Sequence, residues 1–194
     1  ELDVDIWNAI DAADTKPFGF MPFYPGPGLG GHCIPIDPFY LSWKADQHGV
    51  NTRFIDLADT VNREMPRHVV ERVVTLLNDR GVALSNADVL VVGAAYKPDV
   101  SDVRESPAID IISELADRNA QVAYHDPYVP NFEVGDATYE SVPLTGDRVA
   151  SADCVVLVTD HSDLDLEWLV DEASLVFDTR NATGHLDAEN VVRL

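Results

Sequence analysis

The spacing of apolar residues predicts strands that alternate with helices over the second half of the chain. Short apolar runs in this half are typical of strands buried on both faces, and the segments between them have helical periodicity. The predicted strands are 89–93, 121–125, 154–159, 175–178 and 190–194. The predicted helices are 106–119, 146–151 and 164–172, and the stretch 126–145 is expected to be irregular. This alternation predicts an α/β fold with a doubly wound parallel sheet.

The first part of the chain has helical rather than strand periodicity. Helices are predicted over 3–14, from Asp37-Pro38 to about Gly49 with Asp37 as N-cap, and over 53–80. Pro66 is expected to kink or divide the last of these. Its long apolar stripe predicts a partner, either a domain or a second subunit. We therefore expect a helical domain over 1–81 and a sheet domain over 82–194.

A segment rich in proline and glycine separates the first two helices. Between residues 17 and 38 there are six prolines and five glycines, so neither a helix nor a strand is expected there. Aromatic residues interleaved at Phe18, Phe20, Phe23 and Tyr24 argue against disorder. Long ordered loops without regular structure are typical of functional sites.

The charge excludes two classes of partner. Thirteen basic residues stand against 34 acidic ones, giving a net charge of −21, which repels nucleic acid and anionic membranes. The acidic residues are spread along the chain, which argues against a disordered acidic arm. Three lysines stand beside ten arginines, and Asp outnumbers Glu 24 to 10, a bias that resembles proteins of salt-loving archaea. We therefore expect a halophilic protein; the alternative is a merely acidic mesophilic one. No apolar run approaches the ~18 residues of a membrane span. The first residues carry no basic segment, so no signal peptide is expected, and we interpret the chain as part of a longer protein.

The two cysteines have different surroundings. Cys154 lies in a predicted buried strand, where cysteine acts as a small apolar residue. Cys33 lies in the glycine-rich segment, just before a helix N-terminus that favours the thiolate form. Asp37 could cap that helix or orient a water. Two cysteines do not make a disulfide framework, so a reduced, cytoplasmic protein is expected.

Three chemistries are open for Cys33 from the residues alone. It could be an inert loop cysteine, a nucleophile, or a metal ligand with His32, although no further Cys/His pair has ligand spacing and no metal site is predicted. A cysteine hydrolase is disfavoured because the adjacent His32 would have to turn back on its neighbour to act as general base. The density of glycine and proline favours a nucleophile on a ligand-binding loop.

Basic side chains follow two of the predicted strands. Lys97 and Arg104 follow the first strand, and Arg180 follows the fourth, at the sheet edge where doubly wound folds bind ligands. Gly-x-Gly-x-x-Gly is missing after the first strand, so the dinucleotide fingerprint is absent. These cations in an acidic chain suggest an anionic ligand such as a phosphate, or else charges that balance nearby acids. His125-Asp126-Pro127 after the second strand is interpreted as a turn rather than a pocket lining.

Three segments together resemble the UDP-glucose/GDP-mannose dehydrogenase family. Gly28-Leu29-Gly30-Gly31-His32-Cys33-Ile34-Pro35-Ile36-Asp37-Pro38 is similar to its catalytic-cysteine motif, in the form found in members acting on UDP-N-acetylhexosamines. The family's second motif is similar to Tyr96-Lys97-Pro98 together with Asp102-Val103-Arg104-Glu105-Ser106-Pro107. Its third motif is similar to Asp178-Thr179-Arg180-Asn181. The resemblance implies a middle domain with a long connecting helix, followed by a Rossmann-like UDP-binding domain. The family's N-terminal NAD-binding domain, and the middle-domain Lys and Asn that assist catalysis, have no match here.

The resemblance also implies a reaction. The family oxidises the sugar C6 alcohol to a carboxylate with two NAD, and Cys33 would carry the thiohemiacetal and then the thioester, with Asp37 assisting the water. The other implied roles are sugar contacts by Tyr24, Gly28 and Gly30, substrate contacts by Tyr96, Lys97 and Arg180, and an NAD contact by Arg104. A homodimer through residues 53–80 is implied as well. The alternative is a noncatalytic nucleotide-sugar binding module.

Overall fold

The computed structural model describes residues 4–135 and 137–194, so the expected helix start at Asp3 lies outside the described residues. The helices are α1 (Ile6–Asp14), α2 (Asp37–Asp46), α3 (Arg53–Asp79), α4 (Pro107–Asp117), α5 (Gly146–Ser151) and α6 (Leu166–Glu172), with a 3₁₀ turn at Leu84–Asn86. The strands are β1 (Asp88–Val92), β2 (Gln121–His125), β3 (Asn131–Val134), β4 (Ala137–Glu140), β5 (Cys154–Leu157), β6 (Val176–Asp178) and β7 (Val191–Arg193).

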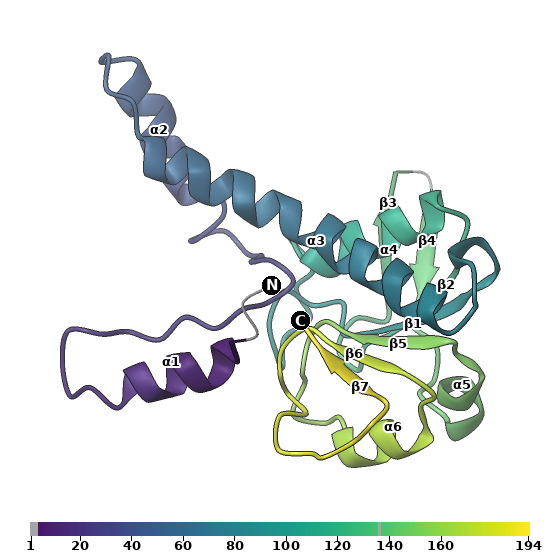
Figure 1. Ribbon diagram of the computed structural model, residues 1–194. Coiled ribbons are helices and arrows are strands. Elements are labelled where there is room, and N and C mark those ends of the chain that lie inside the picture. The colour runs from purple at the N-terminus through teal and green to yellow at the C-terminus, as the bar shows by residue number, and fades with distance from the viewer. Residues whose placement is uncertain (1–3, 136) are drawn as a thin grey trace.

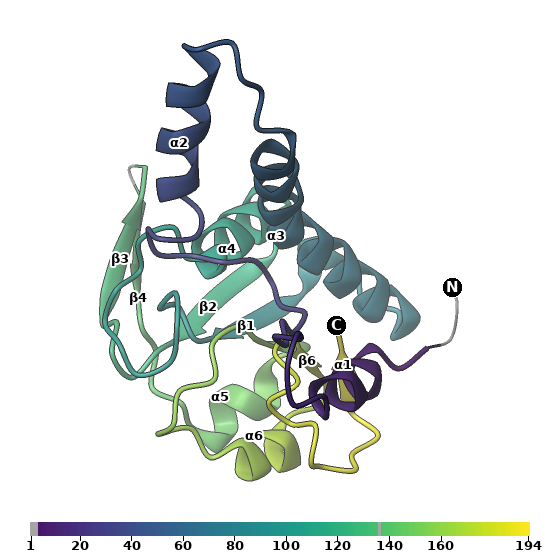
Figure 2. The same ribbon diagram turned by 90° about the vertical axis from the view of Figure 1, so that its left-hand side faces the viewer.

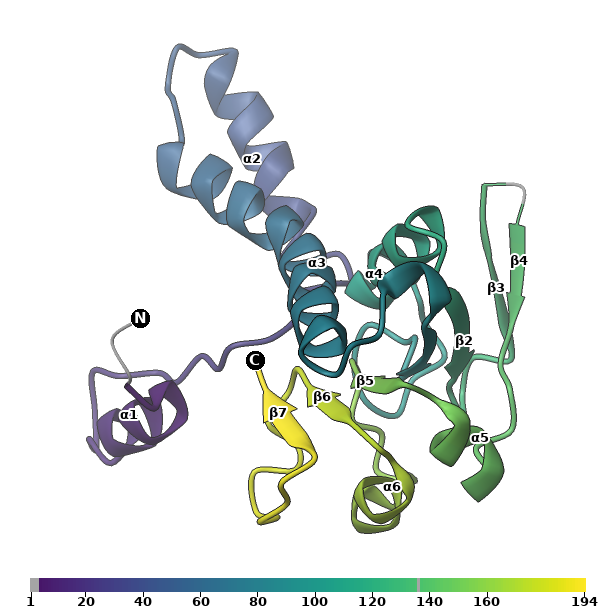
Figure 3. The same ribbon diagram turned by 45° about the vertical axis from the view of Figure 1, so that its right-hand side comes forward.

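Five strands form one parallel sheet in the order β2-β1-β5-β6-β7. Helices α3 and α4 cover one face, and α5 and α6 cover the other (Figures 1 and 3). This confirms the predicted doubly wound parallel sheet. The strand order reverses between β1 and β5, and this switch point is where open α/β sheets bind ligands, beyond the carboxyl ends of the strands.

The alternation of side chains along the strands builds two apolar cores. Val89 and Val91 of β1 face the core under α3 and α4, whereas Leu90 and Val92 face the core over α5 and α6. All four are fully buried, as expected for a central parallel strand that is covered on both faces. The sheet is thereby held as a rigid base for the loops that leave its carboxyl edge.

Helix α3 joins the helical part of the chain to the sheet. It runs through Pro66 as one helix, so of the two outcomes expected at this proline the division is wrong, and a kink stays a prediction. The second half of α3 buries Val69, Val70 and Val73 against the sheet, which supplies a partner for that part of its apolar stripe. The first half lies beside α2 (Figure 2). Ser42 Oγ of α2 donates to Asp56 Oδ1 of α3 over 2.8 Å. The domain boundary at 81 stays a prediction.

Two local expectations differ from the structure. Asp37 is the first residue of α2 rather than its N-cap, because the helix begins one residue early, with Ile36 at the cap position and no side-chain cap. The stretch 126–145 is not wholly irregular, since β3 and β4 form an antiparallel hairpin beside β2. Its strands have four residues each and are mostly exposed, so their apolar pattern is too short to distinguish from a loop.

Helix α1 and the loop that follows it project from the body of the molecule (Figures 1 and 3). Asp5 caps the helix by accepting from the backbone N–H groups of Trp7 and Asn8. The following loop exposes Phe18 and Phe23, with 82% and 76% of their surfaces accessible. None of the helices in the described ranges combines the length and apolar character needed to cross a bilayer.

Candidate functional site

The loops after β1, β5 and β6 meet at the carboxyl edge of the sheet. Thr159, which follows β5, donates from Oγ1 to the Ala95 carbonyl over 2.7 Å, which ties the β5 loop to the β1 loop. Gly93 directly follows β1 with φ 89°, and a Cβ there would collide with the Thr159 backbone. The two loops on either side of the switch point are therefore packed together.

Arg180 lies across this edge, where the resemblance predicted a substrate contact. Its Nε donates to the carbonyl of Val158 over 2.8 Å, and its own backbone N–H donates to Asp178 Oδ1 over 2.9 Å. Burial lowers the pKa of the guanidinium, while the nearby carboxylates of Asp160 and Asp178 raise it. The cation is thus held in a partly desolvated position, where a phosphate would interact with it strongly.

The glycine-rich segment packs directly on the edge that Arg180 occupies. A Cβ on Gly26 would lie 2.9 Å from Arg180 Nη1, and a Cβ on Gly30 would lie 2.7 Å from Tyr96 Cβ. The Gly31 N–H donates to the Arg104 carbonyl over 3.0 Å. The sequence suggested that these glycines allow approach to a ligand. The structure shows that they also allow approach to the β1–α4 loop, which joins the two parts of the site.

A residue of α3 that the sequence analysis missed holds the same segment. Asn62 Oδ1 accepts from the Leu29 N–H over 2.7 Å, and Asn62 Nδ2 donates to the Leu29 carbonyl over 3.1 Å. This two-point pairing fixes the backbone between Gly28 and Gly30. The signal in the sequence is weak, because asparagine inside a helix is only mildly unfavourable.

Cys33 lies on an exposed turn between the glycine-rich segment and α2. The backbone N–H groups of Ile36 and Asp37 both donate to the His32 carbonyl, which closes the turn just ahead of the helix. Cys154 is fully buried in β5, and burial raises the pKa of its thiol to about 12. Of the two thiols, Cys33 is therefore the one available for chemistry.

The other predicted site residues Lys97, Arg104 and Tyr24 each have different partners in the structure. Lys97 is exposed, with its Nζ 5.4 Å from the centre of the Tyr96 ring. Arg104 pairs with Asp102 through Nε, at 2.9 and 3.0 Å from the two carboxylate oxygens, and this pair lowers the pKa of Asp102 to about 2. Tyr24 is turned toward α1, where its hydroxyl donates to Asp11 over 2.9 Å and its ring stacks on Trp7.

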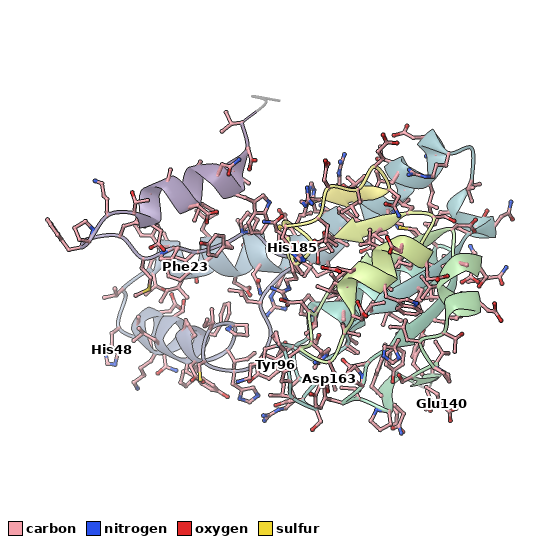
Figure 4. All side chains as sticks on the ribbon, turned by 90° about the horizontal axis from the view of Figure 1, so that it is seen from below. Phe23, His48, Tyr96, Glu140, Asp163 and His185 are labelled. Carbon is pink, nitrogen blue, oxygen red and sulfur yellow. The ribbon has the colours of Figure 1, made fainter. Side chains whose placement is uncertain are left out.

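Two further residues at this edge escaped the sequence analysis. Asp126, interpreted as part of a turn, is buried and accepts hydrogen bonds from the loop after β1. His161, in the loop after β5, is buried beside it. In Figure 4 the labelled Tyr96 and Asp163 mark the neighbouring loops that contain these contacts. Among the described residues, no group of three His, Cys, Asp or Glu side chains is placed to hold a metal ion.

Comparison with known proteins matches both parts of the chain to one family. Residues 1–64 match the central domain of the UDP-glucose/GDP-mannose dehydrogenase family, and residues 90–185 match the UDP binding domain of the same family. The segments matched include the Cys33 turn and the loops after β1, β5 and β6 that form the site.

Individual relatives agree with this assignment. The chain is 35% identical over 193 residues to the UDP-N-acetyl-D-mannosamine dehydrogenase of Methanococcus vannielii, covering 95% of the chain and 42% of that protein. It is 34% identical over 162 residues to the UDP-N-acetyl-D-glucosamine 6-dehydrogenase of Pseudomonas aeruginosa, covering 84% of the chain and 38% of that protein. The UDP-D-ManNAc dehydrogenase structure from Pyrococcus horikoshii superposes with a TM-score of 0.79 at 26% identity, covering 98% of the chain and 43% of that structure. The chain thus spans about two fifths of the length of each.

Proposed function

Because the chain belongs to the UDP-glucose/GDP-mannose dehydrogenase family, we propose that it is the central and UDP-binding part of a UDP-N-acetylhexosamine 6-dehydrogenase. Such an enzyme oxidises the C6 alcohol of the sugar to a carboxylate. The observation that carries the proposal is the contact between Gly26 and Arg180, because it joins the cysteine-bearing segment to the cationic edge of the sheet. A ligand with a diphosphate at Arg180 could then extend its sugar along the segment that leads to Cys33.

The proposed roles divide along the ligand. Arg180 and Lys97 bind the UDP phosphates, with Tyr96 beside them, and charge-assisted hydrogen bonds supply the affinity. Backbone groups around Gly28 and Gly30 line the sugar end. We assign Tyr24 as a further sugar contact. Cys33 is the nucleophile toward the C6 carbon, and Asp37 assists the attacking water.

The described residues do not fit a complete NAD site. The Rossmann dinucleotide loop needs open glycines after its first strand so that the backbone can approach the pyrophosphate. Here the Cβ position of Gly93 is filled by the Thr159 backbone. Arg104, the proposed NAD contact, offers one exposed guanidinium that Asp102 already pairs. We therefore assign the hydride acceptor to a part of the dehydrogenase outside this chain and derive no oxidation step from these residues alone.

The 194-residue chain is expected to bind a UDP-sugar weakly and not to reduce NAD. Hydride transfer needs the nicotinamide held ~3–3.5 Å from the reacting carbon, and the described residues offer no cradle for it. The measurement is absorbance in the NADH band with the chain, NAD and either UDP-N-acetylglucosamine or UDP-N-acetylmannosamine. Steady NADH production by the pure chain would show that it contains a nicotinamide site and would overturn this division of the enzyme.

The alternative is a noncatalytic nucleotide-sugar binding module with the same fold, in which Cys33 has no catalytic role. The two hypotheses predict different reactivities for the Cys33 thiol. A nucleophilic Cys33 is expected to react with iodoacetamide at least about tenfold faster than free cysteine at neutral pH, because catalytic thiols are held in a thiolate-favouring setting. Peptide mapping by mass spectrometry measures the rate, and the buried Cys154 serves as an internal unreactive control. A rate no faster than free cysteine would favour the binding module.

We also propose a homodimer through the first half of α3. Phe54, Leu57 and Val61 expose 89%, 59% and 52% of their surfaces there, which is unusual for one stripe of a helix. We expect a dimer by light scattering in molar KCl, as for a halophilic protein. The dimer should weaken below about 0.1 M salt, where the Debye length reaches ~10 Å and the charge of −21 per chain repels its copy. A monomer at every salt concentration would contradict this, and so would a dimer insensitive to salt.

A further inference from the structure

A short backbone arch presents Lys97 at the carboxyl edge of the sheet. We call residues 94–99 the arch; it leaves β1 after Gly93, and Tyr96, Lys97 and Pro98 form its crown. Its first foot is Ala94 and Ala95, and its second foot is Asp99. Both feet are hydrogen bonded to side chains from other loops. The position of Lys97 therefore depends on what holds those two feet, together with the bond from the Tyr96 N–H to the Asp102 carbonyl over 3.0 Å.

Asp126, just after β2, holds the first foot. Its Oδ2 accepts from the backbone N–H groups of Ala94 and Ala95 over 2.7 and 2.9 Å. Its Oδ1 accepts from the N–H groups of Tyr128 and Val129 over 2.8 and 3.0 Å. The side chain is fully buried. All four partners are donors, so they favour the ionised carboxylate. Burial raises the pKa of Asp126, but the hydrogen bond from His161 and the backbone bonds from Ala95, Ala94 and Tyr128 lower it below its usual range.

His161, after β5, connects the first foot to the second. Its Nε2 lies 2.9 Å from Asp126 Oδ2, and its Nδ1 accepts from the Asp99 N–H over 3.0 Å. Because a backbone N–H can only donate, Nδ1 carries no proton and Nε2 is the donor to Asp126. One neutral imidazole thus bridges both ends of the arch. The ring is also fully buried, with Tyr128 packed over it at a centroid distance of 5.0 Å.

Asp99 makes the second foot a fixed point rather than a flexible end. It has φ 61°, in the left-handed region that aspartate adopts more readily than most non-glycine residues. Its Oδ1 accepts from both the N–H and the Oγ of Ser162, each over 2.9 Å. The second foot is thereby tied to the same β5 loop that carries His161.

We propose that Asp126 and His161 are positioning residues, which set the arch so that Lys97 meets the diphosphate of the UDP ligand. The inference rests on the proposed function for the identity of the ligand. A buried carboxylate hydrogen bonded to a neutral imidazole is by itself weak evidence for a stabilising role. Here Asp126 bonds the N–H groups of Ala94 and Ala95, and His161 bonds the N–H of Asp99, so the pair holds both ends of the arch.

The test compares two replacements of His161 in the full 194-residue chain. His161→Phe keeps a ring against Tyr128 and removes both hydrogen bonds, whereas His161→Gln keeps one donor and one acceptor. We expect His161→Phe to weaken UDP binding by about tenfold, and His161→Gln to stay within about threefold of the wild type. His125→Phe is the matched control, because the His125 imidazole pairs instead with the Val142 carbonyl. It should leave UDP affinity unchanged.

A double variant separates positioning from general damage. If His161 acts through Lys97, the variant carrying both Lys97→Met and His161→Phe should bind UDP no more weakly than Lys97→Met alone. Full additivity of the two effects would overturn the inference. So would a His161→Phe chain that binds UDP as the wild type does while Lys97→Met does not.

A measurement without ligand keeps this inference apart from the proposed function. Hydrogen exchange of the Asp99 amide should be at least about tenfold faster in His161→Phe than in the wild type, and close to the wild type in His161→Gln. Unchanged exchange in His161→Phe would overturn the positioning role, whatever the ligand is. If exchange changes as expected and the wild type does not bind UDP, the proposed ligand is wrong and the assignment of the UDP diphosphate to Lys97 falls with it.

Discussion

Replacing Arg180 by methionine is expected to lower the affinity of the chain for UDP by about 100-fold. Two charge-assisted hydrogen bonds to a phosphate contribute roughly 3 kcal/mol together, which corresponds to that factor. The effect should be large because the Nε bond to Val158 fixes the guanidinium before the ligand arrives, so little conformational freedom is lost on binding. Methionine keeps an unbranched apolar side chain in the partly buried position.

The matched control for this variant is Arg148→Met. Arg148 is also an arginine with a mostly covered side chain, and it pairs with Asp88 at 2.6 and 3.0 Å. That pair lies at the amino end of β1, on the edge of the sheet opposite the proposed site. Calorimetric titration with UDP should therefore give wild-type affinity for Arg148→Met. Equal losses in the two variants would show that the effect of Arg180 is structural and not local to the ligand.

Replacing Asp126 by asparagine is expected to lower the free energy of unfolding by about 2–4 kcal/mol at neutral pH, because an amide cannot accept from all the buried donors that face it. The variant should also change the response to acid. The pKa of Asp126 is depressed in the folded chain, so its contribution is complete above the unfolded value of about 3.9 and is lost as the pH falls through the lower folded value. The difference between wild type and Asp126→Asn should therefore shrink below about pH 4.

Urea unfolding between pH 7 and pH 3 measures this difference. Acid also removes the repulsion among 34 acidic residues, so the comparison between variants matters more than either curve alone. Asp171→Asn is the control, since Asp171 is an exposed residue of α6. It should leave the free energy of unfolding nearly unchanged at each pH. A constant difference between wild type and Asp126→Asn down to pH 3 would contradict the assignment of an ionised, hydrogen-bonded carboxylate.

The elements with a strong local period could be predicted from the sequence. The strand at Gln121–His125 and the helix at Gly146–Ser151 have the predicted bounds, and Ser106-Pro107 opens α4 as expected, with the serine side chain accepting from the Ala108 N–H. These features depend on residues a few positions apart. The hairpin β3–β4 has the same local origin, but its short, exposed strands leave too few apolar positions to show a period.

The contacts that organise the site depend instead on pairings between distant residues. Asn62 and Leu29 are 33 residues apart, and Asp126 and His161 are 35 apart. No periodicity connects such positions, and each side chain taken alone has an ordinary interpretation as a helix residue, a turn aspartate or a loop histidine. The glycines show the intermediate case. Their density predicted a functional segment. Only the fold reveals that Gly30 and Gly31 have no Cβ where Tyr96 and Glu105 pack against them.

The most direct test of the proposed site is calorimetric titration of the 194-residue chain with UDP in molar KCl, with uridine, which lacks the diphosphate, as the comparison ligand. We expect saturable binding of one UDP per chain and no comparable binding of uridine. The same titration repeated with Arg180→Met should give an affinity about 100-fold lower. Absence of UDP binding by the folded wild-type chain, or equal binding of UDP and uridine, would contradict the assignment of the carboxyl edge of this sheet as the site of the UDP diphosphate.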